Sequence, residues 1–422
     1  MRRNFGLVGL VSLGSVATLA ACIGDEPTAP LGDASAPPGD ASILDTGASG
    51  DASGDTSTPT PDGGGDAPAC ASPTQACDKA CVDVSKDPLN CGRCTHDCAG
   101  GECKGGVCQI VTLTQNTNAP TNRNPLATDG TSVCWTVTAT TGFVYCVPAT
   151  SATPVTPRQV WAGKKPGPIA FLGGDVIWTA QGALASANLR FMKGQPNVTD
   201  SGTMVREWIP DGTTVSSYSG YQLTVIGTRP YLGWSESFGS NTTMNIVQCN
   251  VADCSSYTSI HSTTSTDALS ARPKGFATDN TALYVAYGGS PNGQVVRVQT
   301  GGGATPLAST EIDPINVAVD KGFVYWDVNS FAIRRSQSSV ASAVDITTSM
   351  SNVGGLVVHD DVVYWTELGR PDIYTAPAVG GGVPSVYGVS SPTDEPGYLA
   401  HDAKALYWVD RSNGSVKKLA FK

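Results

Sequence analysis

Residues 317–327 read VAVDKGFVYWD, and residues 356–366 read LVVHDDVVYWT. Each stretch has a short apolar run, a turn rich in Asp, Gly or Lys, and a second run of aromatic and β-branched residues. Aromatic and β-branched residues favour strands, and Asp and Gly favour tight turns. Each stretch therefore predicts a β-hairpin.

The same pattern recurs seven times between residues 109 and 422. Aligned on one hydrophobic residue of the second predicted strand, successive repeats lie 43, 56, 51, 41, 39 and 43 residues apart. Their anchors are Trp135, Trp178, Trp234, Val285, Trp326, Trp365 and Trp408. Four short strands in each such repeat predict an all-β fold, a β-propeller. We expect seven blades. Six or eight are the alternatives, because the third repeat departs most from the pattern and residues 190–220 read as long insertions.

The two ends of the repeat region complement one another. The last repeat ends after three predicted strands, with the third at residues 415–421. Residues 109–115 precede the first repeat and have no partner there. We predict that this segment closes the ring as the outer strand of the final blade, which removes the open sheet edges that promote aggregation.

Three of the second strands resemble a known repeat. They contain Tyr325-Trp326-Asp327, Tyr364-Trp365-Thr366 and Tyr407-Trp408-Val409-Asp410, which are similar to the YWTD repeats of receptor propellers. This resemblance also implies a propeller fold.

The amino terminus has the layout of a secretory signal. A basic start, Met1 to Asn4, precedes an apolar stretch over residues 5–18, which is short for a membrane span. Leu19-Ala20-Ala21-Cys22 then resembles the lipobox of bacterial lipoproteins. The resemblance implies that residues 1–21 are removed and that Cys22 is diacylglycerol-modified. The alternative is an ordinary signal peptide with an incidental cysteine.

A lipid anchor on Cys22 would fix the location of the chain. Two or three acyl chains hold a protein stably at a membrane, where one chain is marginal. We therefore expect an extracytoplasmic protein of the bacterial cell envelope that is anchored to a membrane, the outer membrane in particular.

Residues 22–69 read as a disordered acidic linker behind this anchor. Residues 23–69 hold nine acidic residues, no Lys or Arg, and almost no large apolar residue. From residue 70 onward, 24 Lys and Arg face 27 Asp and Glu. The part that folds is therefore close to neutral, and no nucleic-acid partner is expected because such a surface needs clustered basic residues.

Residues 70–108 form a cysteine-rich module that is too small to fold on an apolar core alone. Its eight cysteines are Cys70, Cys77, Cys81, Cys91, Cys94, Cys98, Cys103 and Cys108. In an exported chain these predict four disulfides, whose connectivity the spacing leaves open. The alternative is a zinc knuckle that uses Cys91, Cys94, His96 and Cys98. We favour disulfides, and predict neither a metal nor a cofactor.

The module also resembles a known family. Its Asp87-Pro88-Leu89-Asn90-Cys91-Gly92 stretch and the cysteines that follow are similar to the repeat of plant stigma-specific proteins, and such modules occur in bacterial surface lipoproteins. The resemblance supports disulfides and implies no activity. Beyond the module, four cysteines remain, and their spacing predicts two local disulfides, Cys134 with Cys146 and Cys249 with Cys254.

Two His-Asp pairs, His359-Asp360 and His401-Asp402, have the composition of acid–base dyads. They occupy the repeat position at which Asp129, Asp279 and Asp320 follow the first strand. A residue type that recurs at one position of a repeat indicates a turn cap. We therefore predict no catalytic residue here, and His261 has no carboxylate near it in sequence.

In propellers, ligands bind a rim made by the loops between second and third strands and the loops between blades. Here the rim candidates are Glu236, Tyr287, Asn292, Asp327, Glu367, Arg370, Asp372, Asp410 and Arg411. The alternative interpretation is that each is an ordinary solvated loop residue. Streptogramin-lyase-like propeller enzymes use a histidine on this rim, and none of the four histidines is expected there.

Together these features favour a lipid-anchored extracytoplasmic protein whose propeller binds or scaffolds an unidentified protein or carbohydrate ligand. The alternative is a propeller hydrolase or lyase that acts on an extracellular polymer through the rim carboxylates.

Overall fold

The computed structural model describes residues 70–115, 126–138, 141–181, 188–208, 217–265, 272–289, 292–329, 331–348, 350–389 and 391–422. The predicted signal peptide and acidic linker, with Cys22, lie outside the described residues. The described residues form strands joined by turns and loops. Within these ranges, no helix has the length and apolar character needed to cross a membrane.

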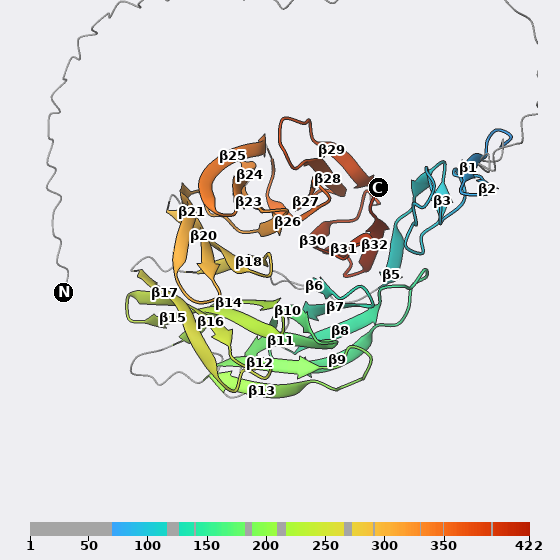
Figure 1. The fold of residues 1–422 in the computed structure, drawn as a ribbon. Coiled ribbons are helices and arrows are strands. Elements are labelled where there is room, and N and C mark those ends of the chain that lie inside the picture. The colour runs from blue at the N-terminus through green and yellow to red at the C-terminus, as the bar shows by residue number, and fades with distance from the viewer. Residues whose placement is uncertain are drawn as a thin grey trace, which may run out of the picture. The chain divides into compact units, whose positions relative to one another are not determined.

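Seven four-stranded antiparallel sheets are arranged as the blades of a β-propeller (Figure 1). Blade 1 comprises β6 (Leu126–Thr128), β7 (Ser132–Val137), β8 (Gly142–Pro148) and β9 (Arg158–Gly163). Blade 2 comprises β10 (Pro166–Leu172), β11 (Asp175–Gln181), β12 (Leu189–Gly194) and β13 (Thr203–Trp208). Blade 3 comprises β14 (Ser217–Ile226), β15 (Arg229–Phe238), β16 (Asn241–Cys249) and β17 (Tyr257–Ser265).

The remaining blades repeat this order. Blade 4 comprises β18 (Pro273–Thr278), β19 (Ala282–Tyr287), β20 (Gly293–Gln299) and β21 (Ala304–Glu311). Blade 5 comprises β22 (Val317–Asp320), β23 (Phe323–Val328), β24 (Ala332–Gln337) and β25 (Val340–Thr348). Blade 6 comprises β26 (Val353–His359), β27 (Val362–Glu367), β28 (Asp372–Pro377) and β29 (Ser385–Val389). Blade 7 comprises β30 (Pro396–His401), β31 (Ala405–Asp410), β32 (Val416–Ala420) and β5 (Val111–Thr114).

The seventh blade confirms the predicted ring closure. β5, which precedes the first blade in sequence, pairs antiparallel with β32 and becomes the fourth strand of the last sheet (Figure 1). Thr114 lies opposite Val416, and Thr112 lies opposite Lys417. The first strands of blades 7 and 1, β30 and β6, are also in contact. The two ends of the propeller sequence therefore share one sheet.

The aromatic anchors explain why the sequence repeats at this spacing. All six anchor tryptophans lie on second strands and are at most 3 % exposed, and Val285 takes their place in blade 4. Each packs among apolar residues of its own blade and a neighbouring blade, as Trp408 does with Ile373 and Leu419. Burial of large apolar side chains is the main stabilising contribution at such contacts.

One expectation from the repeat was wrong in detail. Residues 190–220 are not an insertion, because they contain most of β12, all of β13 and the start of β14. The third repeat is a complete blade whose four strands are nine or ten residues long. The 56-residue interval thus reflects long strands and loops between two ordinary blades, and the blade count is seven.

The cysteine-rich module contains two short hairpins. β1 (Gln75–Cys77) pairs with β2 (Ala80–Val82), and β3 (Cys103–Lys104) pairs with β4 (Val107–Cys108). The disulfides of the module join Cys70 to Cys81, Cys77 to Cys94, Cys91 to Cys103 and Cys98 to Cys108. This disulfide-rich region precedes the propeller, as expected.

The sulfurs of Cys91, Cys98 and Cys108 lie within 4.8 Å of one another, which is a metal-ligand spacing. All three belong to disulfides, however, and a metal binds the thiolate form of cysteine. Two further disulfides lie in the propeller. One joins Cys134 of β7 to Cys146, which lies directly opposite on β8. The other joins Cys249, at the end of β16, to Cys254.

The module packs against the closing blade. Four module cysteines share one buried cluster with Tyr387, Leu419 and Phe421. His96 links the two parts further, because its Nε2 lies 2.6 Å from the carbonyl oxygen of Phe421. Because Cys108 is followed almost at once by β5, the module and the strand that closes the ring are tied together in sequence and in space.

Candidate functional site

The turns between first and second strands are stabilised by aspartates, as the repeat position predicted. In blade 4, Asp279 Oδ1 accepts hydrogen bonds of 2.8 and 2.9 Å from the N–H groups of Thr281 and Ala282. Its Oδ2 accepts a 2.7 Å bond from the Tyr284 hydroxyl. Asp402 in blade 7 repeats the arrangement with the Tyr407 hydroxyl at 2.8 Å. These carboxylates cap the turns, and their hydrogen-bond partners lie within the same blade.

The two histidines beside these turns lie at the end of the blades away from the rim. His401 Nδ1 is 3.1 Å from the backbone oxygen of Asp402 rather than from its carboxylate. Burial lowers the pKa of His401, which favours its neutral form. His359 Nε2 is 3.4 Å from the carboxylate of Asp360, which is 79 % exposed, and the ring stacks on Phe421. Neither pair has the geometry of an oriented dyad.

On the rim, three of the predicted carboxylates are buried rather than solvated. Asp327, Glu367 and Asp410 are 1 %, 6 % and 0 % exposed. Their burial differs from the solvated interpretation, and a role of these residues in ligand binding stays a prediction. Asp327 illustrates the reason: its Oδ1 accepts hydrogen bonds from the N–H groups of Ile315 and Asn316, so it fixes the loop that enters blade 5.

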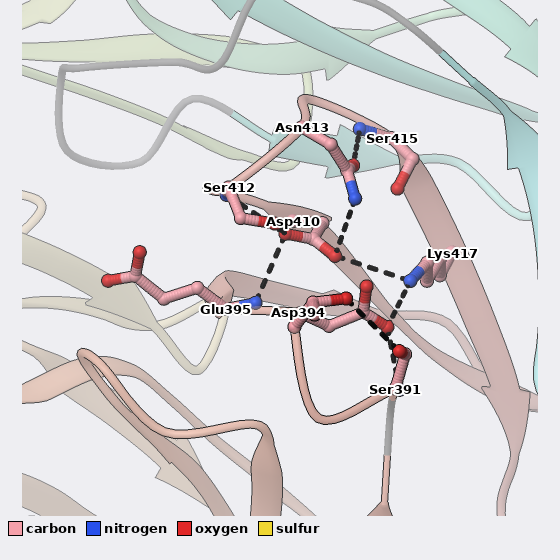
Figure 2. Close-up of polar contacts among 9 residues, drawn as sticks. Ser391, Asp394, Glu395, Asp410, Ser412, Asn413, Ser415 and Lys417 are labelled. Atoms are coloured by element: carbon pink, nitrogen blue, oxygen red, sulfur yellow. Dashed lines mark hydrogen bonds and ion pairs between the residues drawn. The ribbon is translucent and has the colours of Figure 1, made fainter.

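Asp410 lies at the centre of a polar network at the seam of the ring (Figure 2). Its Oδ1 accepts bonds from the Glu395 N–H at 3.1 Å, the Ser412 N–H at 2.9 Å and the Ser412 hydroxyl at 2.6 Å. Its Oδ2 lies 3.2 Å from the Lys417 ammonium, which also contacts Asp394. Burial alone would raise the pKa of Asp410, but these hydrogen bonds outweigh it and lower the pKa to about 2.

The second group of rim residues lies in blade 6. Arg370 Nε is 3.2 Å from Glu367 Oε2, and Arg370 Nη1 donates a 3.4 Å bond to the Tyr374 hydroxyl. Tyr374 in turn donates to Asp372 Oδ2 at 3.3 Å. These contacts raise the pKa of the Arg370 guanidinium. The Arg370 side chain is still 56 % exposed, so it remains available to a partner.

Glu395 joins the two groups. Its Oε1 accepts a 3.0 Å bond from the Gly369 N–H in blade 6 and a 2.7 Å bond from Arg411 Nη1 in blade 7. The Glu395 and Arg411 side chains are 30 % and 32 % exposed. The structure thus brings Arg370, Asp372, Glu395 and Arg411 together as one charged surface, which we call the blade 6–7 ridge.

The other predicted rim residues lie elsewhere. Glu236 in blade 3 accepts a 2.8 Å hydrogen bond from the indole N–H of Trp234, a buried anchor residue of the core. Tyr287 in blade 4 is 3 % exposed, and burial raises the pKa of its hydroxyl. Asn292 is exposed in the following loop. These three residues lie in blades 3 and 4 and are not part of the blade 6–7 ridge.

Sequence reasoning missed Asp394, Glu395 and Lys417. Asp394 and Glu395 lie in the loop between blades 6 and 7, and Lys417 is a 9 % exposed lysine in the third strand of blade 7. Two signals were available. Charged residues are sparse in this chain, so Asp-Glu in an inter-blade loop was conspicuous, and a lysine in a strand of apolar neighbours required a buried partner.

A small cavity lies among the first strands of the propeller. Its volume is about 30 Å³, and it is lined by residues of blades 4 to 7, Gly275, Val317, Leu356 and Leu399 among others. That volume corresponds to about one water molecule. An organic substrate would therefore contact the rim from outside rather than enter this cavity.

Comparison with known proteins supports the two folded parts separately. Residues 55–117 match the Stigma-specific STIG1-like protein family, which agrees with the resemblance of the cysteine-rich module. The match covers the module and short flanks that include β5, but none of the other propeller strands. The comparison with curated protein sequences gave no match.

Solved structures share the propeller fold at low identity. The chain is similar to virginiamycin B lyase from Staphylococcus aureus, with a TM-score of 0.53 and 14 % identity over 74 % of this chain and 99 % of the lyase. It is also similar to YCF48 bound to D1 peptide, with a TM-score of 0.51 and 9 % identity over 74 % of this chain and 95 % of that one. A second structure of the lyase, with quinupristin, has a histidine-to-alanine change that makes it catalytically inactive. These likenesses show the fold alone.

Proposed function

We propose that this chain is an exported lipoprotein of the bacterial cell envelope whose propeller binds or scaffolds another molecule through its rim. The observation that carries the binding role is the blade 6–7 ridge. Arg370 and Asp372 are held by contacts within blade 6, and Glu395 joins Arg411 to blade 6. All four side chains keep part of their surface exposed. Charged groups of both signs that are already ordered lose little entropy when a partner binds.

Two further observations support this role. YCF48, whose fold is similar, was solved bound to the D1 peptide, so that protein uses the fold for peptide binding. The resemblance of three second strands to the YWTD repeats of receptor propellers fits the same use. The ligand that we propose is a protein or a carbohydrate.

Several features support anchoring through Cys22. The lipobox precedes nine acidic residues in a linker without apolar runs, a composition suited to a tether. The twelve other cysteines form six disulfides, which fits an oxidising compartment and leaves Cys22 as the remainder. A membrane is thus the first partner that we propose, and the outer membrane is the site.

The alternative of a hydrolase or lyase has less support. The carboxylates of Asp394 and Asp410 meet near the rim, but the Lys417 ammonium lies against both and the group is buried. All four histidines lie in described segments, and none lies in a rim loop. The described rim loops therefore carry no histidine, and the Asp394–Asp410 pair is closed to a substrate.

Two array experiments test the binding role. The purified full chain is applied to an array of defined oligosaccharides and to an array of overlapping peptides. We expect specific signals that fall at least about tenfold when Arg370 and Arg411 are both changed to Ala, because two ordered contacts are lost. Lys321→Ala, in a turn at the opposite end of the blades, is the matched control and should bind as wild type. Signals that survive the double change would contradict a role for the ridge.

Metabolic labelling tests the anchor. Cells that express the chain are grown with radioactive palmitate, and we expect label in the wild type and none in Cys22→Ser. Equal labelling of both proteins, or label in neither, would contradict lipidation at Cys22.

A further inference from the structure

A second candidate site lies where the cysteine-rich module meets the propeller, away from the rim. It is a pocket of about 210 Å³ bounded by Cys91, Val107 and Cys108 of the module and by Tyr387, Leu419 and Ala420 of the propeller, among others. The lining of the pocket is mostly apolar. The Tyr387 hydroxyl donates to the backbone oxygen of Ala420, so its hydrogen-bonding needs are met within the protein.

The volume indicates the size of the group that fits. An apolar cavity of about 150 Å³ holds a benzene molecule. A pocket of 210 Å³ therefore accepts one aromatic ring or one branched aliphatic group with a short stem. The apolar walls select a group of that kind, because burial of its surface is favourable and no buried polar atom is left unsatisfied.

Basic side chains line the pocket. Arg93, His96 and Lys422 line it, and no side-chain carboxylate does so. In the whole chain, acidic residues outnumber basic residues by 36 to 26. By contrast, the neighbouring cleft of about 700 Å³ contains Glu102 with Lys104, and Asp394 with Lys417, so its lining charges are paired.

His96 is already engaged. Its Nδ1 contacts the carbonyl oxygen of Cys91 and its Nε2 contacts that of Phe421, so both ring nitrogens face backbone acceptors. Two other cations line the pocket, Arg93 and Lys422. The Arg93 guanidinium has no ion-pair partner among the described residues. The Lys422 Nζ lies 5.2 Å from the centroid of the Tyr387 ring. Because both cations line the pocket, both would attract an anion bound there.

We propose that this pocket binds a small apolar carboxylate. The apolar group occupies the space between Val107, Leu419 and Tyr387, and the carboxylate lies between Arg93 and Lys422. A guanidinium matches the planar, two-oxygen geometry of a carboxylate. The proposal does not depend on the blade 6–7 ridge, and either site can exist without the other.

Calorimetric titration of the full chain with three probes tests the proposal. The probes are 3-phenylpropanoate, its neutral amide 3-phenylpropanamide, and acetate. We expect 3-phenylpropanoate to bind with a Kd below about 1 mM. The amide lacks the charge and acetate lacks the apolar group, so each should bind at least about tenfold more weakly. Equal affinity for acid and amide, or no heat from the acid up to about 10 mM, would overturn the proposal.

Variants locate the site. Arg93→Gln and Lys422→Gln should each weaken 3-phenylpropanoate about three- to fivefold, the effect expected of one partly exposed ion pair. Arg158→Gln removes the same charge from an exposed position on β9 of blade 1 and should leave the affinity unchanged. If Arg158→Gln weakens binding as much as Arg93→Gln, general electrostatic attraction explains the result and the proposed site is wrong. Because all three side chains are exposed or at the surface, near-UV circular dichroism should remain that of the wild type.

Discussion

Thr366 on β27 of blade 6 donates a 2.7 Å hydrogen bond from Oγ1 to the backbone carbonyl of Gly397 at the start of blade 7. Both groups are buried, and the bond crosses from one blade to the next. Thr136 in blade 1 makes the same contact with Gly167 in blade 2, at 3.0 Å. A hydroxyl placed directly after the anchor tryptophan thus links consecutive blades.

This link predicts a measurable cost. Thr366→Val keeps the shape of the side chain and leaves the Gly397 carbonyl without its partner, so the free energy of unfolding should fall by about 1–3 kcal/mol. Chemical denaturation measures the change. Thr179→Val is the matched control: Thr179 also follows an anchor tryptophan and is 1 % exposed, but its hydroxyl has no hydrogen-bond partner among the described residues. That variant should be neutral or slightly stabilising. Equal costs for both would contradict the role of the link.

The acid stability of the protein should depend on Asp410. The pKa of this carboxyl is about 2 in the folded chain and about 3.9 in unfolded chains. A carboxyl whose pKa is lowered by folding stabilises the fold above the unfolded pKa, and this contribution is lost as the pH falls through the folded pKa. Stability should therefore decline between about pH 4 and pH 2 in the wild type. Asp410→Asn should show a smaller decline over that range, and denaturation at pH 5, 4 and 3 measures it. An identical decline in both proteins would contradict the prediction.

Lys418 should make the folding stability depend on pH in the alkaline range. This lysine is 1 % exposed on β32, and burial lowers the pKa of its ammonium, although Asp402 and Asp97 oppose the shift. A lysine whose pKa is lowered by folding penalises the fold while it is charged, so stability should rise as the pH increases toward the unfolded value of about 10.4. Lys418→Met should lack this rise. Lys404→Met, at an exposed turn, is the control and should retain it; a rise that persists in Lys418→Met would show that another group is responsible.

The sequence predicts those features of the fold and the site that depend on residues close together in the chain. Trp326, Trp365 and Trp408 recur once in each blade because every one of these blades begins with consecutive strands, so their period predicted the sheets. The closure by β5 was predicted because the last repeat has only three strands of its own. The blade 6–7 ridge is different in kind. Glu395 contacts Gly369 and Arg411, which lie 26 and 16 residues away on two blades, and no local pattern encodes that meeting.

Because the module packs on blade 7, loss of the Cys98–Cys108 disulfide should affect that blade more than loss of the Cys70–Cys81 disulfide. Cys98 and Cys108 are 1 % and 7 % exposed and share a buried cluster with Leu419 and Phe421. Changing both cysteines to Ala should cost about 2–5 kcal/mol, and amide hydrogen exchange in β32 should become faster. Removing the Cys70–Cys81 disulfide, whose cysteines are outside that cluster, is the matched control and should leave exchange in β32 unchanged. Faster exchange in both variants, or in neither, would contradict a coupling between module and ring closure.

We propose that the chain is exported and lipid-anchored, and that it carries six disulfides beside a propeller ring that β5 closes. The intact mass of the protein purified from the membranes of cells that process lipoproteins tests it most directly. We expect a polypeptide that begins at Cys22 and carries two or three acyl chains. Its mass should be twelve hydrogens below that of the fully reduced form, because six disulfides are present. A mass without acyl chains, or with the mass of free thiols, would contradict it.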